Sequence, residues 1–160
     1  MKKIGRTLKR RRHEPKTDYG ARLNLLKQRK MRVVVRRTNR YIIAQLVESE
    51  IAQDKVLKSV TSKDLLEHGW PKEMEGSLKS IQAAYLTGYL LGKTSKAKHA
   101  ILDMGMQRTM PRGRIYAVVK GLIAAGVAVP HSAEALPTEE QMKHNAKLKG
   151  IIEKVTGGIK

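Results

Sequence analysis

Three β-branched segments in the first half of the chain have the pattern of strands. Residues 31–37 and 41–47 are separated only by the polar residues 38–40, which is typical of a hairpin. Residues 56–61 follow a second polar segment, 53–55, which we expect to form the next turn. Three strands in sequence, joined by short connections, predict an antiparallel meander.

Two later segments have the three- and four-residue apolar spacing of helices that bury one face. The first begins at Leu78 and should end near residues 92–98, and the second begins at Gly113 or Arg114 and ends at Gly126. Between them, residues 99–105 form a nearly continuous apolar run, as expected for a buried strand of a sheet covered on both faces. The order of elements predicts an α/β fold: a mixed sheet, made of the antiparallel meander and one helix-connected strand, with helices packed against it.

The segments around this core have weaker patterns. Residues 68–77 are rich in turn-forming residues and predict a loop, and residues 127–129 predict a short extended piece. A helix start is indicated at residues 138–141, where acidic side chains would occupy the first turn. After Gly150 the composition is typical of loose chain ends.

Positive charge is concentrated at the amino-terminal end. The first 40 residues hold 16 Lys or Arg and 2 acidic residues, so they carry 14 of the chain's 19 net positive charges. A localised charge of this size favours a polyanionic partner, because neutralising phosphates releases condensed counterions. Nucleic acid is therefore the expected partner.

The basic segment divides into an arm and a short helix. Residues 2–16 show no periodicity of either kind, and we expect them to be disordered until bound. Thr17 or Asp18 can then cap a helix, because their side-chain oxygens accept free backbone N–H groups. Leu23 and Leu26 would share one face of that helix.

Length and composition fit one compact body with appendages. The 160 residues divide into a basic arm for nucleic acid (1–16), an α/β body (17–140) and a Lys-rich tail (141–160). The sequence has no Cys, which excludes disulfides and thiolate metal sites. It shows neither an apolar secretory segment nor the roughly 20 apolar residues of a membrane helix. We expect a soluble, cytoplasmic protein without membrane contact.

A search for catalytic chemistry finds few candidates. Asp103 is the one acidic residue in an apolar run, where a carboxylate could serve a metal ion or a proton transfer, or hydrogen-bond a neighbouring loop. No second carboxylate lies close in sequence, and the five His residues lack the spacing of metal ligands. These observations favour the structural role for Asp103 and predict no catalytic site, metal or cofactor.

Residues 91–94, Leu-Gly-Lys-Thr, end like a phosphate-binding loop but lack its first glycine. They also fall at the predicted end of a helix, where the polarity is wrong for phosphate. Gly88 and Gly92 are better interpreted as a pair of small residues that lets this helix approach the sheet.

Several basic and aromatic side chains beyond the arm are candidates for RNA contact. Alternation along the hairpin places Arg36 and Arg37 on opposite faces, so at most one of them points toward the core. Tyr19 and Tyr41 lie next to cations and could stack on unpaired bases, although the spacing of Tyr41 also suits a core position. Charge placement adds a last group of arginines, on the hairpin turn and on the loop before the second helix: Arg40, Arg108, Arg112 and Arg114.

His131 follows Val-Pro near the predicted end of the body. Its imidazole could contact a phosphate or simply close a turn, and the residues alone leave both roles open. We therefore count it among the candidate RNA-binding positions.

An ordered series of segments resembles one protein family. The chain is similar to the archaeal branch of the large-subunit ribosomal proteins of universal family eighteen, which bind 5S ribosomal RNA. The resemblance covers roughly residues 6–140. Its segments are RRR at 10–12, KTDY at 16–19, ARLNLLK at 21–27, RVVVRRT at 32–38, IIAQ at 42–45, AAYLTG at 83–88, AILDMG at 100–105 and GVAVPHS at 126–132.

The resemblance implies a structural role in the ribosome. It implies an α/β body on 5S rRNA in the central protuberance, an arm that threads between RNA segments, contacts with large-subunit rRNA and neighbouring ribosomal proteins, and no catalytic activity. Gly20 stands where a basic residue is common, which removes one phosphate contact. The family's RNA-facing positions correspond here to Arg10, Arg11, Arg12, Lys16, Tyr19, Arg22, Arg36 and Arg37.

Two other functions fit parts of the sequence. An RNA-processing or RNA-modifying enzyme could use the arm as a tether, but it would need a cluster of catalytic carboxylates or His residues that the sequence does not offer. A cationic module for acidic membrane surfaces would need an amphipathic basic helix. The irregular spacing of Ile4 and Leu8 does not provide one.

Overall fold

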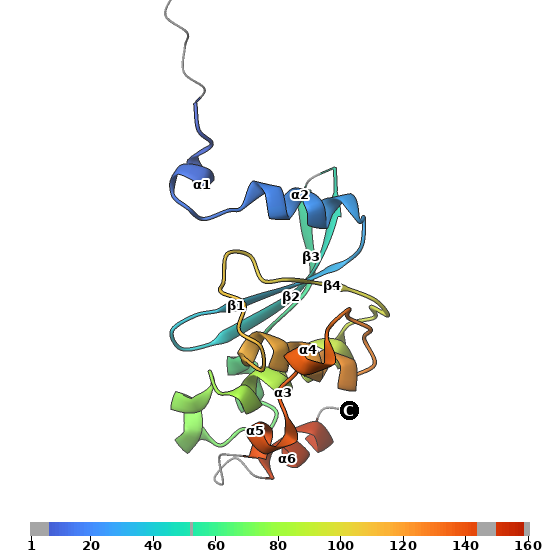
Figure 1. Ribbon diagram of the computed structural model, residues 1–160. Helices are drawn as coiled ribbons and strands as arrows, with labels where there is room; N and C mark the ends of the chain where they lie inside the picture. Colours follow the sequence, from blue (N-terminus) through green and yellow to red (C-terminus); the bar gives the residue numbers. More distant parts are fainter. Residues whose placement is uncertain (1–6, 52, 144–149, 159–160) are drawn as a thin grey trace, which may run out of the picture.

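The computed structural model describes residues 7–51, 53–143 and 150–158, and within them a four-stranded sheet carries the fold (Figure 1). The strands lie in the order β3-β2-β1-β4. The pairs β1–β2 and β2–β3 are antiparallel, and β4 is parallel to β1, so the predicted mixed α/β sheet is confirmed. The strands are β1 (Arg32–Arg37), β2 (Ile42–Glu50), β3 (Gln53–Thr61) and β4 (Ile101–Asp103).

Helices flank this sheet unequally. Figure 1 shows α3 and α4 together beneath one face of the sheet, with α5 and α6 beyond them and α2 at the opposite end of the molecule. The α-helices are α1 (Arg10–His13), α2 (Tyr19–Lys27), α3 (Ile81–Thr94), α4 (Arg114–Ala124), α5 (Glu139–Lys143) and α6 (Ile151–Gly158). Three 3₁₀ helices join them: η1 (Ser62–Leu66), η2 (Lys72–Ser77) and η3 (Ala133–Ala135).

The core lies between the sheet and the α3–α4 pair, and it is almost entirely aliphatic. Alternate β1 residues, Val33 and Val35, are fully buried against it. Trp70 is its one large aromatic side chain, and the indole Nε1 donates a hydrogen bond to the carbonyl of Met74 at 3.1 Å. Chain segments far apart in sequence therefore share one core, which fixes the sheet relative to α3 and α4.

Glycines allow α3 and α4 to approach each other closely. A Cβ atom on Gly88 would lie 2.1 Å from the carbonyl oxygen of Val118, and one on Gly121 would lie 2.0 Å from that of Tyr85. The prediction that Gly88 and Gly92 bring the helix to the sheet is therefore wrong, because these glycines face α4. At the end of α3, Lys93 occupies the last turn, as the sequence predicted.

Some element boundaries differ from the prediction. The expected turn at residues 53–55 is wrong, because these residues already pair in β3 and the chain reverses before them, with Ile51 at a φ of 47°. The expected loop at 68–77 contains η2. The expected strand at 99–105 shortens to β4, which lies at the edge of the sheet with Leu102 only half-buried.

The carboxyl-terminal segment contributes to the core. Thr138 and Gln141 exchange hydrogen bonds between side chain and backbone, which forms the predicted helix start. The expected looseness after Gly150 does not apply to α6, because Ile151 and Val155 are buried in the core.

Candidate RNA-binding surface

The helix that follows the arm is well capped but weakly packed. The Asp18 carboxylate accepts hydrogen bonds from the backbone N–H groups of Gly20 and Ala21 at 2.9 and 3.0 Å, which confirms the predicted cap. No residue of α2 is fully buried. Leu23 and Leu26 both lie in α2, three residues apart as predicted, but Leu23 is 55% exposed, so the face they share is not buried. Side-chain contacts, rather than a buried apolar face, attach α2 to the sheet.

The described part of the arm already has local structure. Residues 10–13 form the single helical turn α1. Arg11 Nε donates to Thr17 Oγ1 at 2.8 Å, and Lys16 Nζ lies 2.8 Å from Glu14 Oε2. Arg10 and Arg12 are exposed. Residues 1–6 lie outside the described residues, and disorder before binding stays a prediction.

Tyr19, which was predicted to stack on an unpaired base, contacts a lysine of the arm within the protein. The Lys9 ammonium lies 4.7 Å from the centre of the half-buried Tyr19 ring. Tyr19 thus begins α2 with a cation over its ring, and its contact with a base stays a prediction.

Four of the predicted RNA-facing cations line one hollow. It has a volume of about 500 Å³ and lies between the arm, α2 and the loop that follows β4. Two carboxylates, Asp18 and Asp103, also line it, so cations outnumber anions at its walls by two. The cations are Arg11, Lys16, Arg22 and Arg36. The hollow is therefore a positively charged cleft at the base of the arm.

A buried arginine lies behind this hollow. Arg32 on β1 is 1% exposed, and its register partners on the neighbouring strands are Val47 and Ile101, both buried. Its Nη1 donates to Asp103 Oδ2 at 2.7 Å, and its Nη2 donates to Asp54 Oδ1 at 2.6 Å. The guanidinium is therefore held between two carboxylates from the two edge strands of the sheet. Asp54 lies on β3, and Asp103 lies on β4.

Each carboxylate also holds a second arginine. Asp54 Oδ2 lies 2.9 Å from Arg22 Nη1 on α2, and Asp103 Oδ1 accepts from Arg36 Nη2 at 3.1 Å. Partial burial raises the pKa of Asp54, but hydrogen bonds from Arg22, Ser49 and Arg32 and the charge of Arg32 lower it to about 2. Asp54 is therefore ionised at neutral pH. Ion pairs link five side chains in the order Arg22, Asp54, Arg32, Asp103 and Arg36.

Asp103 has the structural role that the sequence favoured. Besides the two arginines, its Oδ1 accepts the backbone N–H of Gly105 at 2.9 Å. Asp54 approaches the same buried guanidinium from the other side, which sequence proximity could not reveal. Among the described residues, no three His, Cys, Asp or Glu side chains gather as a metal site would require.

A second basic hollow lies at the far end of the hairpin. Its volume is about 500 Å³, and Arg37, Arg108 and Arg114 line it together with the apolar Ile81 and Ile115. The structure therefore brings two loop arginines, Arg108 and Arg114, together with the exposed Arg37 of β1. Alternation along β1 correctly predicted that Arg36 and Arg37 lie on opposite faces.

Arg112 is placed differently from its neighbours. It does not line the hollow, and its backbone has a φ of 58° while its N–H donates to the carbonyl of Ala135 at 2.8 Å. Its backbone thus fixes the loop, and its exposed side chain is directed by that turn.

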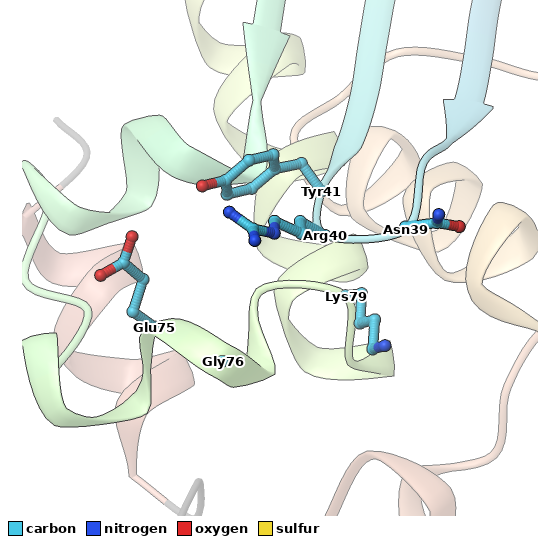
Figure 2. Close-up of a pocket in the computed structure, with 6 residues that line it drawn as sticks. All are labelled: Asn39, Arg40, Tyr41, Glu75, Gly76 and Lys79. Atoms are coloured by element: carbon cyan, nitrogen blue, oxygen red, sulfur yellow. The ribbon is translucent and has the colours of Figure 1, made fainter.

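The hairpin turn carries a third hollow, of about 370 Å³. Figure 2 shows the Arg40 guanidinium beside the Tyr41 ring, with the Glu75 carboxylate directed toward them, while Asn39 and Lys79 point away. Tyr41 is half-buried and packs against the core with part of its surface. The core position therefore applies in part, and base stacking by the rest of the ring stays a prediction.

His131 lies apart from these hollows. Its Nδ1 is 2.7 Å from the carbonyl oxygen of Val129, two residues earlier, and the residue is exposed. It lines a largely apolar recess with Lys30 and His99. This local contact does not decide between the two roles, and phosphate contact stays a prediction.

Sequence reasoning missed two positions that shape the surface. Arg32 begins the same strand as Arg36 and, at even spacing from it, lies on the same face, but the sequence gives no sign of its burial. Gly105 has a φ of 60°, and a Cβ there would lie 2.9 Å from the Arg36 guanidinium. The signal for Gly105 was the run Asp-Met-Gly after a strand, which indicates a turn.

Comparison with known proteins identifies the family. A family model described as "Ribosomal large subunit proteins 60S L5, and 50S L18" matches residues 5–100, more than half of the chain. The large ribosomal subunit protein uL18 of Korarchaeum cryptofilum is 48% identical over 137 residues, covering 84% of this chain and 68% of that protein. The chain belongs to the uL18 family.

Other uL18 proteins match to a similar extent. Those of Methanoculleus marisnigri and Methanoregula boonei are 46% and 40% identical, over 84% and 91% of this chain and 76% and 87% of their own lengths. The match to archaeal members confirms the resemblance that the sequence showed.

Membership of the uL18 family settles the general role. This chain is a structural constituent of the large subunit of the cytoplasmic ribosome, and it is not an enzyme. Its partners are ribosomal RNA and other ribosomal proteins. In the described residues, no helix has the length and apolar character needed to span a membrane.

Proposed function

We propose that this chain binds 5S rRNA and helps attach it to the large rRNA in the central protuberance. The observation that carries this proposal is the convergence of Arg11, Lys16, Arg22 and Arg36 on one hollow at the base of the arm. These four residues come from the arm, α2 and β1, and each corresponds to an RNA-facing position of the family. Their convergence is what a shared RNA segment requires.

The distribution of charge supports a division of labour along the chain. Arm cations neutralise phosphates, which supplies sequence-independent affinity. The body then selects RNA by its shape, with Tyr19 and Tyr41 available for unpaired bases and the second hollow around Arg37 and Arg108 available for a further RNA segment. Neighbouring ribosomal proteins dock on the remaining surface.

The test is a comparison of 5S rRNA with transfer RNA over a series of salt concentrations. We expect the full chain to prefer 5S rRNA, and a chain lacking residues 1–16 to bind more weakly with a shallower dependence of affinity on salt. Equal affinity of the full chain for both RNAs at every salt concentration would contradict the proposal.

A matched variant separates the arm from the body. Arg37→Gln/Arg108→Gln removes two cations of the second hollow and leaves the arm intact. We expect this variant to lose preference for 5S rRNA while it keeps most of its affinity for transfer RNA, because the arm provides the nonspecific attraction.

A further inference from the structure

Arg32 is an unusual residue for the position it occupies. A guanidinium carries a full positive charge, and its transfer to a site that is 1% exposed is unfavourable unless the charge is paired and its donors are satisfied. Here Nε has no hydrogen-bond partner among the described residues. Apolar residues of similar length could fill the same space between Val47 and Ile101. The burial of this charge is therefore not explained by packing alone.

The contacts of Arg32 lead outward to the RNA-facing surface. One oxygen of Asp54 binds Arg32, and the other binds Arg22 on α2. One oxygen of Asp103 binds Arg32, and the other binds Arg36. The buried guanidinium thus stands at the centre of five linked charges, and the two outermost charges line the same hollow.

The Arg36 side chain is fixed from several directions. Its Nη1 donates to the carbonyl oxygens of Val35 and Asp103, each at 2.8 Å, in addition to the contact between Nη2 and the Asp103 carboxylate. The absence of a side chain on Gly105 leaves room for the guanidinium. Of the five N–H donors of this group, Nε–H and one on Nη2 have no partner in the described part of the chain.

Arg22 is fixed at one point only. Its Nη1 lies 2.9 Å from Asp54 Oδ2, and its side chain is 32% exposed. Because α2 has no fully buried residue, this ion pair is also a principal attachment of the helix to the sheet. The orientation of Asp54, which Arg32 and Ser49 determine, therefore sets the position of Arg22.

We propose that Arg32 is a positioning residue: through Asp54 and Asp103 it holds Arg22 and Arg36 as a preformed site for an RNA backbone phosphate in the hollow beside α2. The proposal rests on the proposed RNA-binding function. Two arginines that are fixed before binding lose less side-chain freedom when a phosphate arrives, so they bind it more tightly than mobile ones. The remaining donors of both groups are charge-assisted, as phosphate recognition requires.

The test uses a variant that removes the buried arginine and both of its carboxylate partners together, Arg32→Met/Asp54→Asn/Asp103→Asn. A buried group of ions can often be replaced by neutral residues of similar volume without loss of the fold, whereas removal of one member leaves the others uncompensated. The triple substitution adds one net positive charge. Long-range attraction to RNA therefore increases slightly, and any loss of affinity must come from positioning.

The decisive measurement is a mutant cycle on 5S rRNA binding. In the wild-type background, Arg22→Gln/Arg36→Gln should lower affinity about tenfold and reduce the slope of log affinity against log salt by about 1.4 to 1.8. In the triple-variant background, where both arginines remain but are no longer held, the same double substitution should have less than half of each effect. Hydrogen exchange of the α3 and α4 amides checks that the fold is kept.

A second variant keeps the test decisive if the triple substitution does not fold. Arg32→Lys retains the buried positive charge but loses the planar fork that reaches two carboxylates at once. We expect the cycle in this background to show a reduced effect as well. The matched control is Glu48→Gln, an exposed carboxylate on the neighbouring strand, for which the full effect of the double substitution should remain.

The outcomes separate the two proposals. Equal effects of Arg22→Gln/Arg36→Gln in all backgrounds, with wild-type preference for 5S rRNA intact, would overturn the positioning role of Arg32 and leave the proposed function standing. A wild-type chain without preference for 5S rRNA would overturn the proposed function itself. A reduced effect confined to the Arg32 backgrounds supports the positioning role.

Discussion

Different physical forces hold the helices at the two ends of this molecule in place. Helices α3 and α4 meet through Gly88 and Gly121, so closely that neither position has room for a methyl group. Helix α2, at the opposite end, contributes no fully buried residue and is joined to the sheet by the Arg22–Asp54 ion pair. One contact depends on shape, and the other depends on charge.

This difference separates the part that must be rigid from the part that must respond to RNA. Close apolar packing is insensitive to salt and excludes alternatives, because any displacement creates a void or a clash. An ion pair that is about one third exposed is weaker and is screened by salt. A polyanion can therefore contact the exposed donors of the α2 cations without disturbing the core.

The largest effect on folding is expected from Gly121→Ala. The added methyl group would lie 2.0 Å from the carbonyl oxygen of Tyr85, and this oxygen belongs to backbone that cannot rotate away. Separating α3 from α4 should lower the free energy of unfolding by more than about 3 kcal/mol. Urea denaturation measures this change.

The control is Gly76→Ala, since nothing lies within 4 Å of a Cβ at that position. It should change the free energy of unfolding by no more than about 0.5 kcal/mol. If both variants unfold at the same urea concentration as the wild type, close packing does not determine the stability of this end.

A smaller, pH-dependent effect is expected from Asp54→Asn. The folded-state pKa of about 2 lies below the ordinary value of 3.8, so the ionised carboxylate stabilises the fold above pH 3.8 and this contribution is lost as the pH falls toward 2. Solvent screening limits the contribution to about 1 kcal/mol. The variant should therefore be less stable than the wild type at pH 6, and the difference should shrink as the pH falls from 5 to 2.5.

Guanidinium denaturation is unsuitable for this measurement because it screens charge, so urea at constant ionic strength is required. Glu48→Gln, on the neighbouring strand, should leave stability within about 0.5 kcal/mol of the wild type at each pH. A pH-independent deficit in the Asp54 variant would show that the residue acts by packing rather than by charge.

Local patterns in the sequence were sufficient for much of the fold. Alternation in residues 32–37 and the three- and four-residue spacing in residues 114–124 each depend on neighbours in sequence, and both elements were predicted. The prediction of a turn at residues 53–55 was wrong, because polar residues on an exposed strand have the same composition as a turn. The prediction that Gly88 contacts the sheet was wrong, because a small residue indicates a close approach without indicating which element approaches.

The candidate surface was predictable in its members but not in its support. Arg22 and Arg36 stood out by charge and by resemblance, whereas the burial of Arg32 depends on Asp54 and Asp103, which are 22 and 71 positions away in sequence. No local pattern encodes such contacts. Folding creates the low-dielectric site in which these three charges become interdependent.

Loss of the α2 cap is expected to have a modest effect. Asp18→Ala removes the acceptor for two backbone N–H groups, which should cost about 1 kcal/mol of local helix stability. Because α2 lies outside the main core, its amides should exchange faster while those of α3 are unchanged. Asp18→Asn, which keeps an acceptor oxygen, should restore most of the protection, and faster exchange throughout the molecule would contradict the local character of α2.

The smallest effect on folding should come from the arm. Arg10→Gln/Arg11→Gln/Arg12→Gln changes three exposed side chains, of which only Arg11 donates a hydrogen bond beyond α1, so the free energy of unfolding should stay within about 0.5 kcal/mol of the wild type. The slope of log affinity for 5S rRNA against log salt should nevertheless fall by about 2 to 3, because three phosphate contacts are lost. A matched set of exposed cations on β3, η1 and η2, outside the arm and α2, Lys58→Gln/Lys63→Gln/Lys72→Gln, removes the same charge. If it reduces the slope equally, net charge alone governs binding; a smaller reduction shows that the position of the arm matters.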